Sequence, residues 1–328
     1  MPSPAAVSYL LAALAVPLVL HFHLLPAVFA GLAVHVLTGK LAARLPKHLG
    51  QVAHEVALAA IVIAVILGLC GIGLGAWSFL HGHHGMAALL AAMAETLQNL
   101  RRLLPAELSD ILPETMDELG AQLTSLLREN SRNISFLGLE GVKTIAHILL
   151  GMVVGGMTSL HRFSGDGGPV LAAELHNRAR SLSEAFDKVV FAQVKISLLN
   201  TLLTGVYLLV ILPLWGVHLP MVTILIPLTF IVGLIPVIGN LISNAAIVLI
   251  SLGVSLGVAA ASSAFLVAIH KLEYFTNARI VGGEVHASAW ELLCAMLAME
   301  AVFGISGLIA APVAYAWLKG ELKAHGMI

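Results

Sequence analysis

The chain has 328 residues, of which 59% are hydrophobic and only 11% are charged, whereas about a quarter of the residues in a soluble domain carry a charge. The mean hydropathy is +0.96 and the hydrophobic residues come in long blocks, so lipid rather than water is expected to surround the chain. A formal net charge of -1, without a clustered basic surface, excludes a nucleic-acid partner.

The apolar blocks predict an all-α, polytopic membrane protein with about eight transmembrane segments, because a bilayer core of about 30 Å requires about 20 apolar helical residues. Helices are expected rather than strands, since backbone groups in lipid must be paired within the segment. Six spans are expected at residues 5–20, 26–45, 56–80, 141–160, 195–214 and 221–236. The opening sequence lacks the features of a removable signal peptide, so the first span is expected to be retained.

Basic residues in the short loops predict the orientation of the spans. They lie between the second and third spans, between the fourth and fifth spans and in the C-terminal tail: Lys40, Arg44, Lys47, Arg162, Arg178, Arg180, Lys188, Lys319 and Lys323. These loops and both termini are therefore expected in the cytoplasm. Residues 81–137, which carry an acidic bias, are expected outside it.

The division expected from this pattern is residues 1–80 with three spans, an amphipathic helical region at 81–137 and a transmembrane core at 138–328. The middle region has two apolar stripes and is expected to lie on the membrane surface or to pack against other subunits. A further amphipathic helix is expected along the cytoplasmic face at residues 169–190. His81, His83 and His84 favour a solvated turn over a metal site, because no carboxylate or cysteine stands nearby to complete a ligand set.

Two apolar stretches, residues 241–270 and 287–318, are longer than one span and shorter than two. Their interruptions are Gly253 and Gly257 in the first stretch, and Gly304, Ser306 and Gly307, followed by Pro312, in the second. Each stretch is expected to be a re-entrant hairpin or one broken, tilted helix. Paired interruptions are typical of a transporter's binding region, because irregular backbone at membrane depth must line a cavity or be buried. Close packing of helices on the glycines is the alternative.

Polar residues accompany these interruptions. Asn240, Ser243 and Asn244 stand together at the start of the first stretch, where they could bind a small polar solute, cap a helix or bond to a neighbouring helix. Glu300 has the most apolar surroundings of any carboxylate in the chain. Because an ionised carboxylate is costly in lipid, Glu300 is a candidate for proton or cation coupling, with pairing or interfacial exposure as the alternatives.

Enzymatic chemistry is not expected. The sequence has no P-loop or HExxH motif, so neither ATP hydrolysis, a cofactor nor a catalytic metal is indicated. Cys70 and Cys294 stand in apolar blocks and are read as small hydrophobic side chains.

Three motifs occur in the second half of the chain: LIPVIGN at residues 234–240, KLEYFTNARIVGGEVHASAWELL from Lys271 and VFGISGLIAAPVAYAWL from Val302. Their types and order resemble the autoinducer-2 exporter (AI-2E) family. The resemblance implies a homo-oligomeric transporter of the bacterial inner membrane, in a family linked to export of the signal autoinducer-2 and to sodium–proton exchange. The positions it singles out are Pro236, Gly239, Asn240, Glu273, Gly304, Gly307 and Pro312. Asn277 is a further candidate for the solute or ion path.

The leading hypothesis is a secondary transporter or facilitator that moves a small polar solute outward along a path lined by the two interrupted stretches. A second hypothesis is cation–proton antiport centred on Glu300 or Glu273. A third, from another class, is a membrane scaffold whose extracytoplasmic helices recruit partners.

Overall fold

The structure is a computed structural model that describes residues 3–81, 98, 99, 102, 118, 125, 131–161, 169–235, 238–285 and 288–327. Helices make up most of these ranges, which contain no strand. The all-α membrane fold expected from the sequence is thereby confirmed. Most of residues 81–137, including His83, His84 and the two amphipathic stripes, lies outside the described ranges, as do Arg162 and Pro236.

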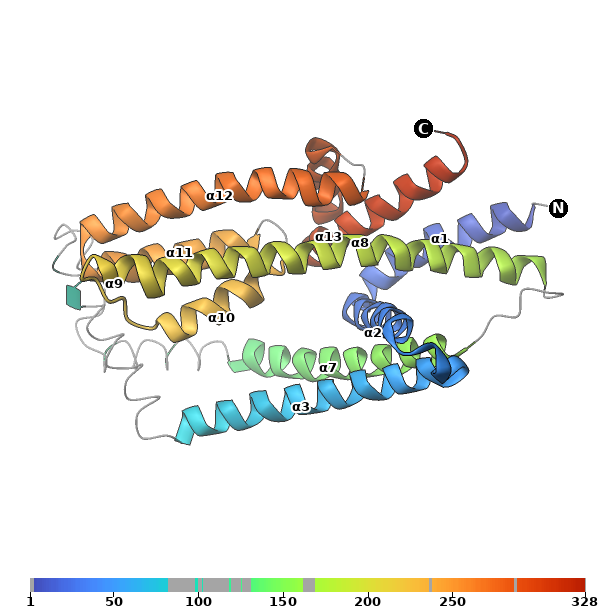
Figure 1. The fold of residues 1–328 in the computed structure, drawn as a ribbon. Coiled ribbons are helices and arrows are strands. Elements are labelled where there is room, and N and C mark those ends of the chain that lie inside the picture. Colours follow the sequence, from blue (N-terminus) through green and yellow to red (C-terminus); the bar gives the residue numbers. More distant parts are fainter. Residues whose placement is uncertain are drawn as a thin grey trace. The chain divides into compact units, whose positions relative to one another are not determined.

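Figure 1 shows the helices in chain order. They are α1 (Pro4–His21), α2 (Leu25–Arg44), η1 (Lys47–Val52), α3 (Ala53–His81), α7 (Ser131–Leu160), α8 (Val170–Val206), η2 (Tyr207–Ile211), α9 (Leu212–Leu214), α10 (Val222–Gly233), α11 (Ile238–Val254), α12 (Leu256–Val285) and α13 (Ala289–Ala324). Six helical segments in the described ranges are long and apolar enough to cross a membrane: α1, α2, α3, α7, α8 with its continuation to Leu214, and α13. Large aliphatic side chains are exposed along them, as a lipid environment requires.

The chain forms two compact units. The first consists of Met1–Gly71, Leu137–Phe191 and Val281–Ile328, and the second of Ile72–Phe136 and Ala192–Ile280. The division into residues 1–80, 81–137 and 138–328 stays a prediction.

In the first unit, α2 and α7 cross with their backbones in contact. A Cβ atom on Gly151 would lie 2.0 Å from the carbonyl oxygen of Ala27, and one on Gly155 would lie 2.1 Å from that of Gly31. The same four-residue spacing continues to His35 and Ser159, whose Nδ1 and Oγ atoms lie 3.1 Å apart. Small residues repeated every four positions therefore allow this crossing, as they commonly do between membrane helices.

The helix α8 unites two segments that the sequence pattern predicts as separate helices. The amphipathic helix expected at residues 169–190 and the span expected at 195–214 form one continuous helix from Val170 to Val206. A π-helical turn, η2, and then α9 extend it to Leu214. The sequence between the two expected segments contains neither proline nor glycine, so nothing ends the helix there.

The second unit has its apolar core around Tyr207, Leu208, Leu212, Leu225, Ile247 and Leu266. Here α10 has only 12 residues, a length of about 18 Å that is too short to cross a bilayer alone. It therefore differs from the expected span at 221–236. Instead α10 turns back onto α11, where a Cβ on Gly239 would lie 2.0 Å from the carbonyl oxygen of Val232.

Both interrupted stretches fold back on themselves. In the first, the helix stops between Val254 and Leu256, and the hydroxyl oxygens of Ser251 and Ser262 lie 2.8 Å apart, so α11 and α12 form a hairpin. In the second, Gly304 has φ 61° and ψ -146° and divides α13 into two arms. A Cβ on Gly307 would lie 2.0 Å from the carbonyl oxygen of Met299, a contact that a straight helix would not make. The expected interruptions are confirmed, and each is a turn between two antiparallel arms.

Candidate functional site

A row of buried and half-buried polar side chains follows one face of α8 and its continuation in the second unit. Its members recur every three or four residues, so they share one helix face within a largely apolar segment. We call this row the polar seam; it consists of Gln193, Ser197, Asn200, Thr204 and Tyr207. Polar side chains at membrane depth are costly unless they find partners or serve a function.

The first part of the polar seam holds the turn between α10 and α11. Gln193 Nε2 donates to the carbonyl oxygen of Gly233 at 2.8 Å, and Ser197 Oγ donates to that of Phe230 at 2.7 Å. These bonds satisfy carbonyl groups at the end of α10, which have no partner inside their own helix. The seam therefore fixes the position at which α10 ends.

An amide pair forms the middle of the seam. Asn200, only 4% exposed, donates from Nδ2 to Oδ1 of Asn240 at 2.9 Å. On α11, Ser243 is buried and its hydroxyl donates to the carbonyl oxygen of Asn240 at 3.3 Å, while Asn244 is half-buried. Gly239 makes the pair possible, because its lack of a side chain lets α11 start directly against α10.

Two hydroxyl groups near this pair lack a partner. Thr201 Oγ1 and Thr204 Oγ1 are buried and form no hydrogen bond within the described residues. A threonine hydroxyl can both donate and accept, and buried polar groups in native proteins are almost always satisfied. The unpaired hydroxyls next to Asn200 therefore leave hydrogen-bonding capacity for a bound polar molecule or water.

The last part of the seam ties α8 to the α11–α12 hairpin. Tyr207 is 1% exposed, its hydroxyl lies 2.9 Å from Ser262 Oγ, and Ser262 in turn lies 2.8 Å from Ser251 Oγ. The ring of Tyr207 stacks on Phe265, with ring centres 3.9 Å apart. This chain of three hydroxyls occurs where α8 becomes a π-helical turn, a distortion that is frequent at functional sites.

The polar seam is chemically neutral. Its side chains are amides and hydroxyls, and of its members only Tyr207 can ionise. Neutral donors and acceptors suit a hydroxylated, uncharged solute, whereas proton-coupled exchange requires a group that gains and loses a proton.

A second polar site, a large cavity, lies in the first unit. A cavity of about 1090 Å³ between α2, α7 and α8 is lined by His35, His161 and His176, and we call it the histidine cavity. It also contains the ion pair of Lys40 Nζ with Asp187 Oδ1, 2.5 Å apart. None of the described residues forms a cluster of the type that holds a metal ion.

The arms of α13 carry a third polar group, also in the first unit. Glu291 Oε2 accepts hydrogen bonds from Tyr315 at 3.0 Å and from Lys319 at 2.5 Å. Glu291 also completes the capping box with Ser288 at the start of the helix. Residues 28 positions apart would be about 42 Å apart in a straight helix, so this ion pair closes the hairpin.

The residues expected from sequence fall into distinct groups. Asn240 and Ser243 meet the polar seam in the second unit, with Gly239 at the turn beside them. Gly304, Ser306, Gly307 and Pro312 belong to the α13 hairpin in the first unit, where Pro312 is buried and Ser306 half-buried. Glu300 is exposed on the first arm of α13. Glu273 and Asn277 belong to α12, but their side chains are not among those described.

The members of the polar seam on α8 were missed by reasoning from sequence. Glycines, prolines and charges drew attention to other segments, and a single Ser, Asn or Thr in an apolar helix is common. A signal was present nonetheless: polar residues at 193, 197, 200, 204 and 207 keep the period of one helix face over four turns. The histidine cavity had no comparable signal, because its histidines come from three separate helical segments and their ends.

A comparison with models of protein families found one match, described as AI-2E family transporter, over residues 6–325. The matched range includes the polar seam, the histidine cavity and both hairpins. No match was found among curated proteins or solved structures.

Proposed function

Because the chain belongs to the AI-2E transporter family, with nearly its whole length matched, we propose that this membrane transporter exports a small, uncharged, hydroxylated solute of the autoinducer-2 type. The polar seam is the binding element in this proposal. A solute of that kind offers several hydroxyl groups, each a donor and an acceptor, and requires neutral partners of matching chemistry.

The observation that carries the proposal is the amide pair of Asn200 and Asn240, with the unpaired hydroxyls of Thr201 and Thr204 beside it. A purely structural seam would satisfy all of its own polar groups, since each unsatisfied one lowers stability by about 1–3 kcal/mol. These amides and hydroxyls could exchange their hydrogen bonds within the protein for hydrogen bonds to a solute. Binding would then require no large change in the total number of hydrogen bonds.

The experiment measures solute flux into inside-out proteoliposomes that contain the purified protein. Autoinducer-2 is added outside, and the amount in the lumen is determined over time. Asn200→Leu removes the amide but keeps a similar volume, so we expect flux to fall by at least about tenfold if the lost hydrogen bonds contribute on the order of 1.4 kcal/mol. Leu202→Ala on the exposed face of α8 is the control and should transport normally.

Two outcomes would contradict the proposal. One is wild-type flux of autoinducer-2 through Asn200→Leu. The other is proton movement that depends on sodium and needs no organic solute, which would favour cation–proton antiport; Glu300→Gln would then be the decisive variant. If the protein is instead a scaffold, the wild-type liposomes should show neither flux.

The proposal also includes the protein's surroundings. In this proposal the protein is located in the inner membrane of a bacterium. Both of its termini lie in the cytoplasm, as the basic loops predict. Assembly into a homo-oligomer is proposed from the family resemblance, with the lipid bilayer and the transported solute as the other partners.

A further inference from the structure

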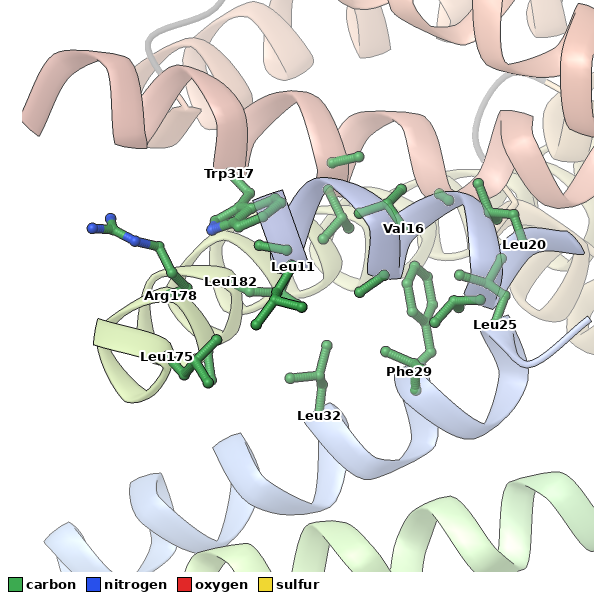
Figure 2. Close-up of a pocket in the computed structure, with 18 residues that line it drawn as sticks. Leu11, Val16, Leu20, Leu25, Phe29, Leu32, Leu175, Arg178, Leu182 and Trp317 are labelled. Carbon is green, nitrogen blue, oxygen red and sulfur yellow. The ribbon is translucent and has the colours of Figure 1, made fainter. Parts of the chain in front are cut away.

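An apolar cavity of about 350 Å³ lies in the first unit, among α1, α2, α8 and α13. Figure 2 shows that Leu20, Leu25 and Phe29 form one end of its wall and that Arg178 and Trp317 stand at the other. Every other lining residue is Ala, Val, Leu or Phe. A volume of this size lies within the range of small-molecule sites, about 300–1,000 Å³.

The two residues at the Arg178 end each carry a buried N–H group without an acceptor. Arg178 Nε and Trp317 Nε1 form no hydrogen bond to any part of the chain that the structure describes. Two such donors at the same end of one cavity are unusual in a native protein, in which buried donors are almost always satisfied. An occupant that brings an acceptor would remove this cost.

The remaining atoms of the Arg178 guanidinium are already engaged. Nη1 is paired with Glu321 and Nη2 with Glu174 at 3.1 Å, and the ring of Tyr9 covers the guanidinium at 4.0 Å. Tyr9 also donates to Glu321 at 3.0 Å. Two carboxylates thus face one guanidinium, and the excess negative charge disfavours an occupant whose acceptor is an anion.

The occupant must therefore combine an apolar body with a neutral acceptor. Membrane lipids joined by ester bonds have this combination: an acyl chain ending in an ester carbonyl. Water is a poorer occupant, because it would bind only at the two N–H groups and leave the apolar remainder of the cavity unfilled. Access is open at the Arg178 end, where Leu11 is 44% and Leu175 37% exposed.

We propose that this cavity binds one acyl chain of a zwitterionic glycerolipid, whose ester carbonyl accepts hydrogen bonds from Arg178 Nε and Trp317 Nε1. The chain extends along α1 toward Phe29. The positive group of the headgroup faces Glu174, which the ion pair with Arg178 leaves partly exposed. Cavity shape, unpaired donors and local charge all fit the same occupant.

The first test maps the position of the lipid. The protein is reconstituted with phosphatidylethanolamine that carries a photoreactive diazirine near the end of one acyl chain, and labelled peptides are identified by mass spectrometry. We expect labelling of α2 around Phe29. Ala12→Phe places a ring in the cavity and should reduce this labelling roughly tenfold, because a filled cavity leaves no room for the chain.

The control is Ala13→Phe, the same change at the next residue, which is exposed and does not line the cavity. It should label α2 as the wild type does. Equal labelling of α2 in the two variants would overturn the proposal. So would labelling confined to the exposed faces of the helices, which would indicate surrounding bilayer lipid only.

The second test addresses the carbonyl. Diacyl phosphatidylethanolamine is compared with its dialkyl ether analogue, which lacks both carbonyl groups, in competition with the photoreactive lipid. The ester lipid should compete better by at least roughly two- to tenfold, the range expected from a single ordinary hydrogen bond. Trp317→Phe removes one donor and keeps the ring, so it should reduce this preference, whereas Trp290→Phe at an exposed position should not. Equal competition by the two lipids in the wild-type protein would overturn the assigned hydrogen bonds.

Discussion

The hydroxyl of Tyr207 ends the polar seam, and its position shows how single atoms hold the second unit together. The hydroxyl contacts Ser262 at 2.9 Å, and its ring stacks on Phe265 within the apolar core. The ring and the hydroxyl therefore make separable contributions, since one packs and the other bonds.

Tyr207→Phe should separate them. The variant keeps the stacked ring and loses one hydrogen bond between helices, so we expect the free energy of unfolding to fall by about 0.6 kcal/mol, and by no more than about 1.7 kcal/mol. Reversible unfolding in mixed micelles measures this difference. Tyr207→Ala, which also removes the ring from the core, should cost about 3 kcal/mol or more; equal losses in both variants would show that packing plays no part.

Turns between helices are the elements on which this fold depends, and Gly304 occupies one of them. Its φ of 61° with ψ of -146° is a backbone conformation that only glycine adopts readily.

Gly304→Ala should therefore lower the free energy of unfolding by about 1–3 kcal/mol and weaken the pairing of Glu291 with Lys319. Gly320→Ala is the matched control: this glycine is helical, with open space around it, and alanine there should be neutral or stabilising. Thermal unfolding in detergent compares the two variants, and a larger loss from Gly320→Ala would contradict the hairpin.

The crossing of α2 and α7 gives a second matched pair of glycines. A methyl group at Gly155 would meet the backbone oxygen of Gly31 at 2.1 Å, whereas one at Gly141 on the same helix would meet nothing within 4 Å. Gly155→Ala must push the two backbones apart, so we expect a lower melting temperature. Gly141→Ala should leave it unchanged or raise it. The same melting temperature for both variants would show that α2 and α7 do not cross in this way.

The sequence predicted individual elements better than their contacts. Length and apolarity decide where a membrane helix runs, so the segment expected at 5–20 became α1 from Pro4 to His21. Gly304 was identified because a helix interior disfavours glycine. The pairing of Glu291 with Lys319 could not be inferred, because nothing local relates residues 28 positions apart. Asn200 was overlooked for the same reason: its importance comes from Asn240, which lies on another helix.

At the scale of the whole molecule, contacts in the first unit support the proposal that the two ends of the chain lie on the same side of the membrane. Tyr9, near the start of α1, donates to Glu321 and lies 3.1 Å from a ring nitrogen of His325, near the end of α13. Because the start of α1 contacts the end of α13, these two helix ends cannot lie on opposite faces of a bilayer about 30 Å thick. The positive-inside rule predicts that this side is the cytoplasm, as proposed above.

A labelling experiment tests this placement. Ser3→Cys and Met327→Cys are made separately after Cys70 and Cys294 have been replaced by serine, and a membrane-impermeant maleimide is applied to intact cells and to inside-out vesicles. We expect both cysteines to react in the vesicles and neither in the cells. Labelling of the two positions from opposite sides would contradict the contact between α1 and α13, and labelling of both in intact cells would reverse the orientation.

The folding of α13 back on itself also affects how the topology of this chain is assigned from its sequence. A stretch whose two arms are joined by Glu291 and Lys319 brings the polypeptide back to the face from which it departed. A hydropathy plot records the same stretch as a crossing, because length and apolarity alone do not reveal a reversal. Each such reversal changes whether the number of crossings is odd or even, so the plot would predict the wrong compartment for a reporter fused downstream unless the glycine at the turn is taken into account.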